Sequence, residues 1–248
     1  MILSVIITSY NFSKYIKQCV DSVLSQKTDF KFEILIRDDF SNDGTESFLK
    51  DLYSGNEKIR ILSAKENLGP YGNVKLMIDE CRGKYISHID GDDYLTDPYK
   101  FQRQVYFLET HPDFIMHSVG YRSIEPGGEI TPNEVAYLCP LKFNVCTEDL
   151  LDENIVGFGR TFRNTPGIIE GWMMDTPYLD WAMNFGISLL GKIRCGDWPG
   201  GIYRHSPEGM FSLKSDEEKA ENNKKTKDLL KFIHSRKLED LVKPVSNI

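Results

Sequence analysis

Short apolar runs rich in β-branched residues alternate with amphipathic stretches through the first 112 residues of the chain. Runs of this kind, each closed by polar residues, are typical of strands buried in a parallel sheet, whereas apolar positions recurring every three or four residues predict helices. Strands are predicted at 3–8, 33–37, 59–62 and 84–89, and helices are predicted after the cap Ser13, from Thr45, after Pro70 and from Pro98. Four strand–helix units in succession predict a mainly parallel sheet covered by helices, a Rossmann-like α/β fold.

The rhythm changes after residue 112, and the second half of the chain indicates a smaller α+β part. We predict a strand at 114–123, a turn at 125–128, a short helical turn from 147, a helix at 178–190, and two short strands near Ile193 and Ile202. The stretch Ser215-Asp216-Glu217-Glu218 has the pattern of a capping box and opens a charged helix that ends near Lys237. The pattern therefore divides the chain into 1–112, 113–214 and 215–248.

Composition and charge exclude several classes of protein. The chain has 248 residues, 40% of them hydrophobic and 27% charged, which is ordinary for a soluble folded protein. Its net charge of −7 argues against binding that depends on nucleic-acid phosphates. No apolar run approaches the ~18 to 20 residues of a membrane span, and the amino-terminal residues lack the pattern of a secretory leader. Five widely spaced cysteines without a Cys-x-x-Cys pair favour reduced thiols, so we expect a cytoplasmic protein.

Acidic and polar residues follow three of the predicted strands. Thr8 ends the first strand, Asp38-Asp39 follows the second and Asp90-Gly91-Asp92-Asp93 follows the fourth. Ligands of open parallel sheets bind beyond the carboxyl ends of the strands, so these loops are expected to converge. Clustered carboxylates repel one another, and their hard oxygens without nearby His or Cys favour Mn²⁺ or Mg²⁺. The alternative is a solvated loop whose acids cap helices.

The same edge offers groups suited to a nucleobase. A carboxylate at Asp39 can accept the imide hydrogen of a uracil or thymine ring, while Thr8 and Tyr10 frame the base. Asp39 could equally cap its own loop, and Tyr10 could pack on the following helix as an aromatic wedge. Since Mg²⁺-like ions complete their coordination shell with phosphates and water, the acidic edge indicates a nucleotide or diphosphate partner.

Four motifs in order resemble those of family 2 glycosyltransferases. They are Ser4-Val5-Ile6-Ile7-Thr8-Ser9-Tyr10-Asn11, Ile36-Arg37-Asp38-Asp39-Phe40-Ser41-Asn42-Asp43-Gly44-Thr45, Glu66-Asn67-Leu68-Gly69, and Gly83-Lys84-Tyr85-Ile86-Ser87-His88-Ile89-Asp90-Gly91-Asp92-Asp93-Tyr94. The close match covers about the first 110 residues. It implies the A-type glycosyltransferase fold, in which a nucleotide-binding half merges with an acceptor half. It also implies inverting transfer of a sugar from a nucleotide-sugar, most often a UDP-sugar.

The resemblance also assigns roles to individual residues. It implies that Asp92 ligates the metal, that Asp90 contacts ribose or metal-bound water, and that Asp93 orients the loop. It implies nucleotide-sugar binding by these residues: Thr8, Tyr10, Asp39, Asn67, Asp90, Gly91 and Arg204. Arg204 belongs to a Tyr-Arg-x-His-like segment in which His205 stands one place early and Ser206 occupies the expected position. Arg204 can neutralise a phosphate, and its structural alternative is a surface ion pair.

The family's catalytic base corresponds to an acid before an aromatic residue and a helix. Here Leu179-Asp180-Trp181 matches that pattern, and the following Gly191-Lys192-Ile193 resembles the stretch that follows it in the family. The resemblance therefore implies that Asp180 is the base, with Asp175 as its competitor. An acid that merely stabilises the amino-terminal end of a helix is the structural alternative for Asp180.

The implied partners are a nucleotide-diphosphate sugar and a glycan or lipid-linked acceptor of cell-surface glycan synthesis. The basic residues of the last helix favour either a solvated helix or peripheral contact with the inner face of the membrane. A metal-dependent nucleotidyltransferase is disfavoured because no glycine-rich loop follows the first strand. A phosphoacceptor signalling domain is disfavoured because the chain is about twice as long as one such domain. A catalytically silent protein that binds a nucleotide-sugar stays an open alternative. The sugar, the acceptor and the oligomeric state are not specified by these motifs.

Overall fold

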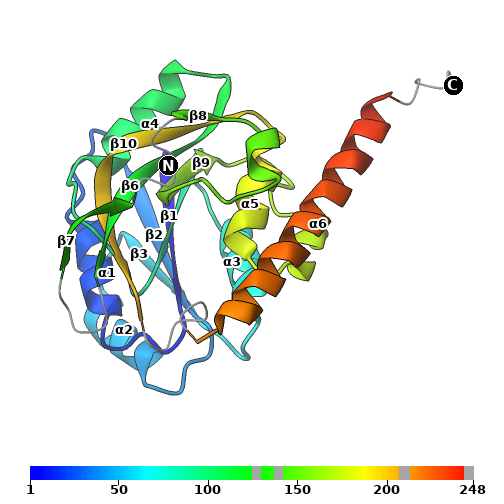
Figure 1. The fold of residues 1–248 in the computed structure, drawn as a ribbon. Coiled ribbons are helices and arrows are strands. Elements are labelled where there is room, and N and C mark those ends of the chain that lie inside the picture. The colour runs from blue at the N-terminus through cyan, green and yellow to red at the C-terminus, as the bar shows by residue number, and fades with distance from the viewer. Residues whose placement is uncertain (125–129, 137–141, 207–212, 243–248) are drawn as a thin grey trace, which may run out of the picture.

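A single twisted sheet forms the centre of the molecule in the computed structural model, which describes residues 1–124, 130–136, 142–206 and 213–242 (Figure 1). Its strands are β1 (Leu3–Ser9), β2 (Phe32–Asp38), β3 (Ile59–Leu62), β4 (Tyr85–Asp90), β5 (Tyr94–Leu95), β6 (Phe114–Ile124), β7 (Ile130–Ala136), β8 (Asn144–Val145), β9 (Phe158–Arg163) and β10 (Lys192–Arg204). They follow the order β3-β2-β1-β4-β9-β6-β10-β5, with β7 paired to β6 and β8 to β10. The sheet therefore continues without a break across residue 112.

Helices cover both faces of this sheet (Figure 1). They are α1 (Ile16–Leu24), α2 (Thr45–Tyr53), α3 (Gly69–Asp79), α4 (Lys100–Thr110), α5 (Leu179–Ser188) and α6 (Asp216–Val242), with short 3₁₀ turns η1 (Glu148–Leu150) and η2 (Gly171–Asp175). Alternate residues of β1 face opposite sides: Val5 and Ile7 pack with α1, α2 and α4, whereas Ile6 packs with α3 and α5. This period of two builds one core on each face, and it confirms the predicted α/β class.

The first four predicted strands are confirmed as β1 to β4, which run parallel in the order β3-β2-β1-β4. The first helix begins at Ile16 rather than after Ser13, because the Ser13 amide donates to the Asp43 carboxylate (2.9 Å) and the Ser13 side chain caps nothing. The two short strands predicted near Ile193 and Ile202 are one bulged strand, β10. The turn predicted at 125–128 lies outside the described residues. The sequence analysis anticipated only part of the remaining elements of the second half.

The sequence analysis did not predict β5, β7, β8 or β9, and of these β9 lies inside the sheet rather than at its margin. It lies between β4 and β6 and runs antiparallel to both. Its sequence, Phe-Gly-Arg-Thr-Phe-Arg, places two arginines and a glycine with φ +59° in six residues, so it lacks the apolar run of a central strand. Arg163 compensates by donating to the carbonyl oxygens of Phe114 (2.9 Å) and Leu108 (2.5 Å). As a result, β9 joins the two halves of the sheet.

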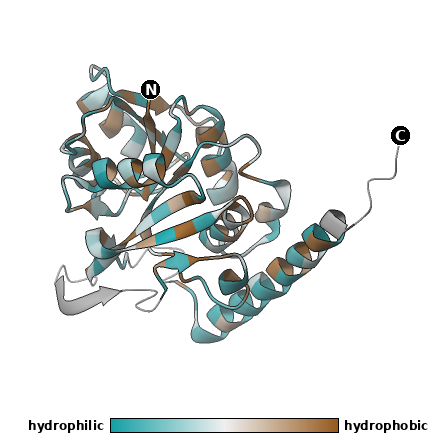
Figure 2. Ribbon diagram, turned by 90° about the horizontal axis from the view of Figure 1, so that it is seen from above, coloured by the Kyte–Doolittle hydropathy of each residue, from teal (hydrophilic) through white to brown (hydrophobic). Residues whose placement is uncertain are grey.

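Helix α6 begins with the predicted capping box. Ser215 and Glu218 exchange reciprocal bonds of 2.8 and 3.2 Å, as expected for this motif. Leu230 is fully buried against the body, and the Lys231–Asp152 and Lys237–Glu170 ion pairs (2.7 and 3.0 Å) tie the helix to it. Most of its surface is hydrophilic, and its far end runs clear of the body (Figure 2). No helix in the described part of the chain is long and apolar enough to cross a bilayer.

Candidate active site

The loops that follow β1, β2 and β4 meet at the carboxyl edge of the sheet. Strand β1 lies between β2 and β4, so its last residues touch both neighbouring loops. The Asp39 amide donates to the Ser9 carbonyl (2.8 Å), and the Thr8 hydroxyl donates to Oδ1 of Asp90 (2.7 Å). The Gly91 amide donates to the Thr8 carbonyl (2.8 Å). Residues 8, 39 and 90 to 91, which sequence motifs single out, are thus brought together.

Asp39 is nearly fully buried, and one of its carboxylate oxygens, Oδ1, accepts two hydrogen bonds. Oδ1 accepts from Nη1 of Arg37 (2.6 Å) and from the Leu68 amide (3.0 Å). Arg37 is itself 2% exposed and donates a second bond to Asn73 (2.9 Å). A buried carboxylate held by a guanidinium and a backbone amide is fixed in orientation. The arrangement suits Asp39 as an acceptor for a ligand N–H.

Aromatic and apolar side chains surround this carboxylate on the surface. Tyr10 is 47% exposed, Phe40 56% and Leu68 38%, and they come from the loops after β1, β2 and β3. Phe40 has φ +66°, which is strained for a residue with a bulky side chain, whereas Asn11 has φ +58°, which asparagine tolerates. The Asn11 amide donates to Ser41 (2.7 Å), which ties the two loops together. Exposed rings together with the strained backbone at Phe40 point to a binding surface. Asn67 lies beside it and accepts from the Gly69 amide (2.9 Å), which starts α3.

The acidic loop after β4 holds carboxylates of unequal character. Partial desolvation tends to raise the pKa of Asp90, but His88 and the Thr8 hydroxyl outweigh it and lower the pKa. Burial, together with the charge of Asp90, raises the pKa of Asp92 to about 7. Burial and the same neighbouring acids raise the pKa of Asp93 far above its usual range. Gly91 is required here, since an added Cβ would lie 2.9 Å from the Thr8 carbonyl oxygen. The cluster of like charges fits a divalent cation, whose charge would stabilise all three carboxylates.

Arg204, at the end of β10, is attached to this loop. Its amide donates to Asp93 (2.8 Å), its Nε donates to the Asp92 carbonyl (2.9 Å), and Nη2 donates to Gln18 (2.9 Å). The guanidinium also lies over the Tyr15 ring at 4.6 Å. Arg204 therefore fixes the acidic loop. The next residue, His205, packs edge to face on Tyr203, with ring centroids 5.0 Å apart.

Asp180 lies exposed in the first turn of α5. Burial raises the pKa of Tyr121, and the charges of Asp93 and Asp180 both add to this effect, so the two acids lie near one ring. Asn154 donates to Oδ2 of Asp180 (2.7 Å), and Arg160 donates to its carbonyl (3.3 Å). Asp175, the competing candidate, ends η2 and is also exposed.

Arg160 is the functional candidate that sequence reasoning missed. It projects from β9, a strand that was not predicted, and its guanidinium also contacts Nδ1 of His88 (3.2 Å). His88 in turn lies 3.2 Å from the Thr8 hydroxyl and 3.5 Å from Asp90. A single arginine in a stretch without a regular apolar pattern does not reveal from the sequence that it lies in the site. Only the pairing of β9 with β4 brings it between the acidic loop and Asp180.

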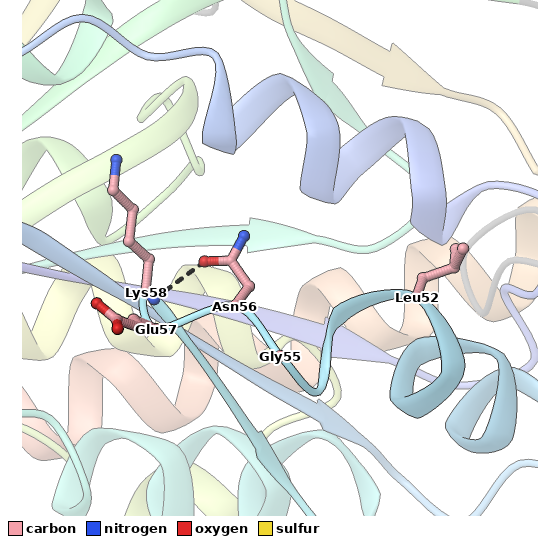
Figure 3. A pocket seen from close by; sticks show the side chains of 5 residues that line it. All are labelled: Leu52, Gly55, Asn56, Glu57 and Lys58. Atoms are coloured by element: carbon pink, nitrogen blue, oxygen red, sulfur yellow. Dashed lines mark hydrogen bonds between the residues drawn. The ribbon is translucent and has the colours of Figure 1, made fainter.

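A hollow on the surface lies elsewhere. It is lined by Leu52, Gly55, Asn56, Glu57 and Lys58, in the turn between α2 and β3, where the Lys58 amide donates to Asn56 (3.0 Å; Figure 3). This turn precedes β3, so it lies at the edge of the sheet opposite to the converging loops. Within the described ranges, no group of three or more His, Cys, Asp or Glu side chains is arranged to hold a metal ion by itself. A cation at Asp92 would therefore need further oxygens from a ligand or water.

Solved structures with similar folds come from glycosyltransferases. The Staphylococcus aureus protein TarS (residues 1–349), crystallised with UDP-GlcNAc, superposes with a TM-score of 0.66 at 17% identity, over 87% of this chain and 62% of that one. The mannosyltransferase PcManGT of Pyrobaculum calidifontis, in complex with GDP-Man and Mn²⁺, gives 0.59 at 16% identity, over 88% and 59%. At this identity the likeness concerns the fold, and it confirms the expected A-type glycosyltransferase architecture.

Sequence comparison identifies the family. An uncharacterised protein of Mycobacterium tuberculosis is 34% identical over 212 residues, which are 84% of this chain and 60% of that protein. WfaP of Escherichia coli, named as a UDP-Glc:α-D-GlcNAc-diphosphoundecaprenol β-1,3-glucosyltransferase, is 34% identical over 160 residues, 61% of each chain. This chain thus spans only about 60% of the length of these relatives. The model of glycosyl transferase family 2 matches residues 4–166, well over half of the sequence, and the chain belongs to that family.

Proposed function

We propose that this protein transfers a sugar from a nucleotide-diphosphate sugar to an acceptor hydroxyl with inversion at the anomeric carbon. The observation that carries the proposal is the convergence of the acidic loop after β4 with Asp180 on α5: Arg160 donates to the Asp180 carbonyl and contacts the ring of His88, which lies 3.5 Å from Asp90. UDP as the nucleotide is supported by the UDP-GlcNAc bound to TarS and by the name of WfaP. A divalent metal is supported by the Mn²⁺ of PcManGT.

The donor would lie across the carboxyl edge of the sheet. Asp39 accepts the imide N–H of the base through the oxygen that Arg37 and Leu68 leave unused, and Tyr10 stacks on the ring. Thr8, Asn67 and Gly91 shape the same surface, Asp90 contacts the ribose, and Arg204 adds positive charge while holding the loop. Asp92 would ligate Mn²⁺ or Mg²⁺, which neutralises charge on the departing diphosphate when bound.

The acceptor would lie between the donor sugar and α5. The Asp180 carboxylate takes the proton from the acceptor hydroxyl as that oxygen attacks the anomeric carbon from the face opposite the diphosphate. The transition state then resembles an oxocarbenium ion. The acceptor class that we propose is a glycan or lipid-linked saccharide of the cell surface, at the cytoplasmic face of the membrane, because WfaP acts on a lipid-linked sugar by its name.

A thermal-shift panel tests the donor site. Nucleoside diphosphates and nucleotide-sugars are added with and without Mn²⁺ to the wild type and to Asp92→Asn. One nucleotide is expected to raise Tm in a metal-dependent manner, since a ligand at 100 times its Kd stabilises the folded state by about 2.7 kcal/mol. Asp92→Asn should lose only the metal-dependent part. Formation of a glycosylated product separates an enzyme from a silent binder, and a panel without any nucleotide response contradicts the proposal.

A further inference from the structure

A chain of three side chains leads from β9 to the carboxylate of Asp180. Nη1 of Arg160 donates to Oδ1 of Asn184 (3.3 Å), and Nδ2 of Asn184 donates to Oδ1 of Asn154 (2.9 Å). Nδ2 of Asn154 then donates to Oδ2 of Asp180 (2.7 Å). The members come from a strand, a helix and the loop that precedes the strand, so no local sequence motif contains them.

The direction of this chain is fixed by its first member. A guanidinium has five N–H donors and no acceptor, so Asn184 must present its amide oxygen to Arg160. The NH₂ group of Asn184 then faces Asn154, which must accept through its own oxygen. The NH₂ group of Asn154 is consequently left for Asp180. Turning either amide by 180° would set donor against donor and acceptor against acceptor, and at the buried Asn184 water cannot readily replace the lost partners.

Burial makes this arrangement persistent. Asn184 is 1% exposed, whereas Asp180 at the end of the chain is exposed. Water competes poorly for a buried amide whose partners are all in place, and a fully satisfied polar network stiffens its surroundings. An exposed aspartate in the first turn of a helix would otherwise rotate freely. The hydrogen-bonded side chains thus connect the exposed carboxylate of Asp180 to the rigid sheet and restrict its rotation.

We propose that Arg160, Asn184 and Asn154 are positioning residues that hold Oδ2 of Asp180 and thereby turn Oδ1 toward the acceptor, as the oxygen that takes its proton. The proposal rests on the proposed function and deepens it, because it names what orients the base. Oδ2 shares one of its lone pairs with the N–H of Asn154, which makes Oδ2 less basic than Oδ1 and favours transfer of the proton to Oδ1. The acceptor O–H bond breaks, the new O–H bond forms at Oδ1, and the acceptor oxygen forms its bond to the anomeric carbon as the bond to the diphosphate breaks.

The test starts at Asn154, which is only partly buried and touches no residue of the donor edge. Asn154→Leu removes the donor at similar size, and Glu153→Leu, at the exposed neighbouring position, serves as the matched control. We expect kcat to fall by about 10- to 100-fold in Asn154→Leu, the scale of a misplaced reacting group. The donor KM and the Mn²⁺-dependent thermal shift should stay at wild-type values, and the control should retain kcat. Asn154→Gln, which keeps an NH₂ donor, should restore part of the loss.

A double-mutant cycle separates a chain from independent contacts. If Asn184 acts through Asn154, Asn184→Leu in an Asn154→Leu background lowers kcat no further, whereas independent effects multiply. Should Asn184→Leu fail to fold, the Asn154 series decides alone. Wild-type kcat in Asn154→Leu, or a loss that Glu153→Leu shares, would overturn the inference although the enzyme transfers sugar. A wild type without transfer on any donor would instead overturn the proposed function, and the inference with it.

Discussion

The donor edge and the acceptor side of this site are built in different ways. At the donor edge, β2, β1 and β4 are parallel neighbours, so the residues after each strand meet through short backbone contacts such as Asp39 to Ser9. On the acceptor side, Asp180 is oriented by the side-chain amide of Asn154 and by Arg160, which lie 26 and 20 residues away in sequence. The donor groups therefore belong to motifs at strand ends that parallel pairing brings together, whereas the orientation of the base depends on side-chain contacts that no motif marks.

The two regions join at β9 and α4, around a buried lysine. Lys100 is 1% exposed, and its Nζ donates to Gln104 (2.9 Å) and to Ser87 of β4 (3.4 Å). Gln104 in turn donates to the Gly159 carbonyl of β9 (2.9 Å) and accepts from Thr161 (2.7 Å). A polar network therefore lies beneath the junction, and changes on either side of it should have separable effects.

Asp180→Asn should give the largest effect. The amide cannot take a proton from the acceptor, so turnover is expected to fall by ~10²-fold or more, the scale of a general base. Donor binding should persist because Asp180 makes no contact with residues 8, 39 or 90. Steady-state kinetics measure the turnover of this variant, and a nucleotide thermal shift measures its donor binding. Asp175→Asn is the matched control, and unchanged turnover in Asp180→Asn would transfer the role of base to another acid.

Lys100→Met should change how stability depends on pH. Burial lowers the pKa of Lys100 to about 7, whereas a lysine in the unfolded chain titrates near its ordinary value, roughly 10.4. Between these values the unfolded chain binds more protons, so this group makes the folded state more stable as pH rises. The free energy of unfolding of the wild type, relative to Lys100→Met, should therefore increase from pH 7 to pH 9, by about 2 kcal/mol at most. Urea denaturation of both proteins at pH 7 and pH 9 measures this difference. If the difference in unfolding free energy is the same at the two pH values, the lowered pKa of Lys100 is contradicted.

Phe40→Gly should give the smallest effect, confined to the donor edge. Glycine adopts φ +66° without strain, which offsets its greater freedom in the unfolded chain, so stability should change by no more than about 1 kcal/mol. Loss of the exposed ring should weaken nucleotide binding roughly tenfold, the scale of one stacking contact, and leave kcat unaltered. Calorimetric titration with the preferred nucleoside diphosphate measures this. Tyr106→Ala, at an exposed ring on α4, is the control, and equal affinities in all three proteins would exclude Phe40 from the site.

The order of elements in the first half was readable because each one is a local pattern. Apolar runs such as 3–8 and 33–37 specify buried strands, and residues such as Gly91 mark places where the backbone approaches another strand closely. The cap predicted for α1 was wrong because it depends on a contact that is not local. The Ser13 amide bonds to Asp43 from a different loop, and a contact between loops leaves no trace in a local pattern.

The sequence by itself determined the α/β class, the parallel strands and the loops that carry Thr8, Asp39 and Asp92, because periodicity and strand ends are properties of neighbouring residues. Only the tertiary structure decided that β9 enters the sheet antiparallel between β4 and β6, and that Arg160 thereby lies between His88 and Asp180. An antiparallel strand rich in polar residues is stabilised by partners distant along the chain. Its place follows from the hydrogen bonds that it makes there, and these exist only once the rest of the sheet has formed.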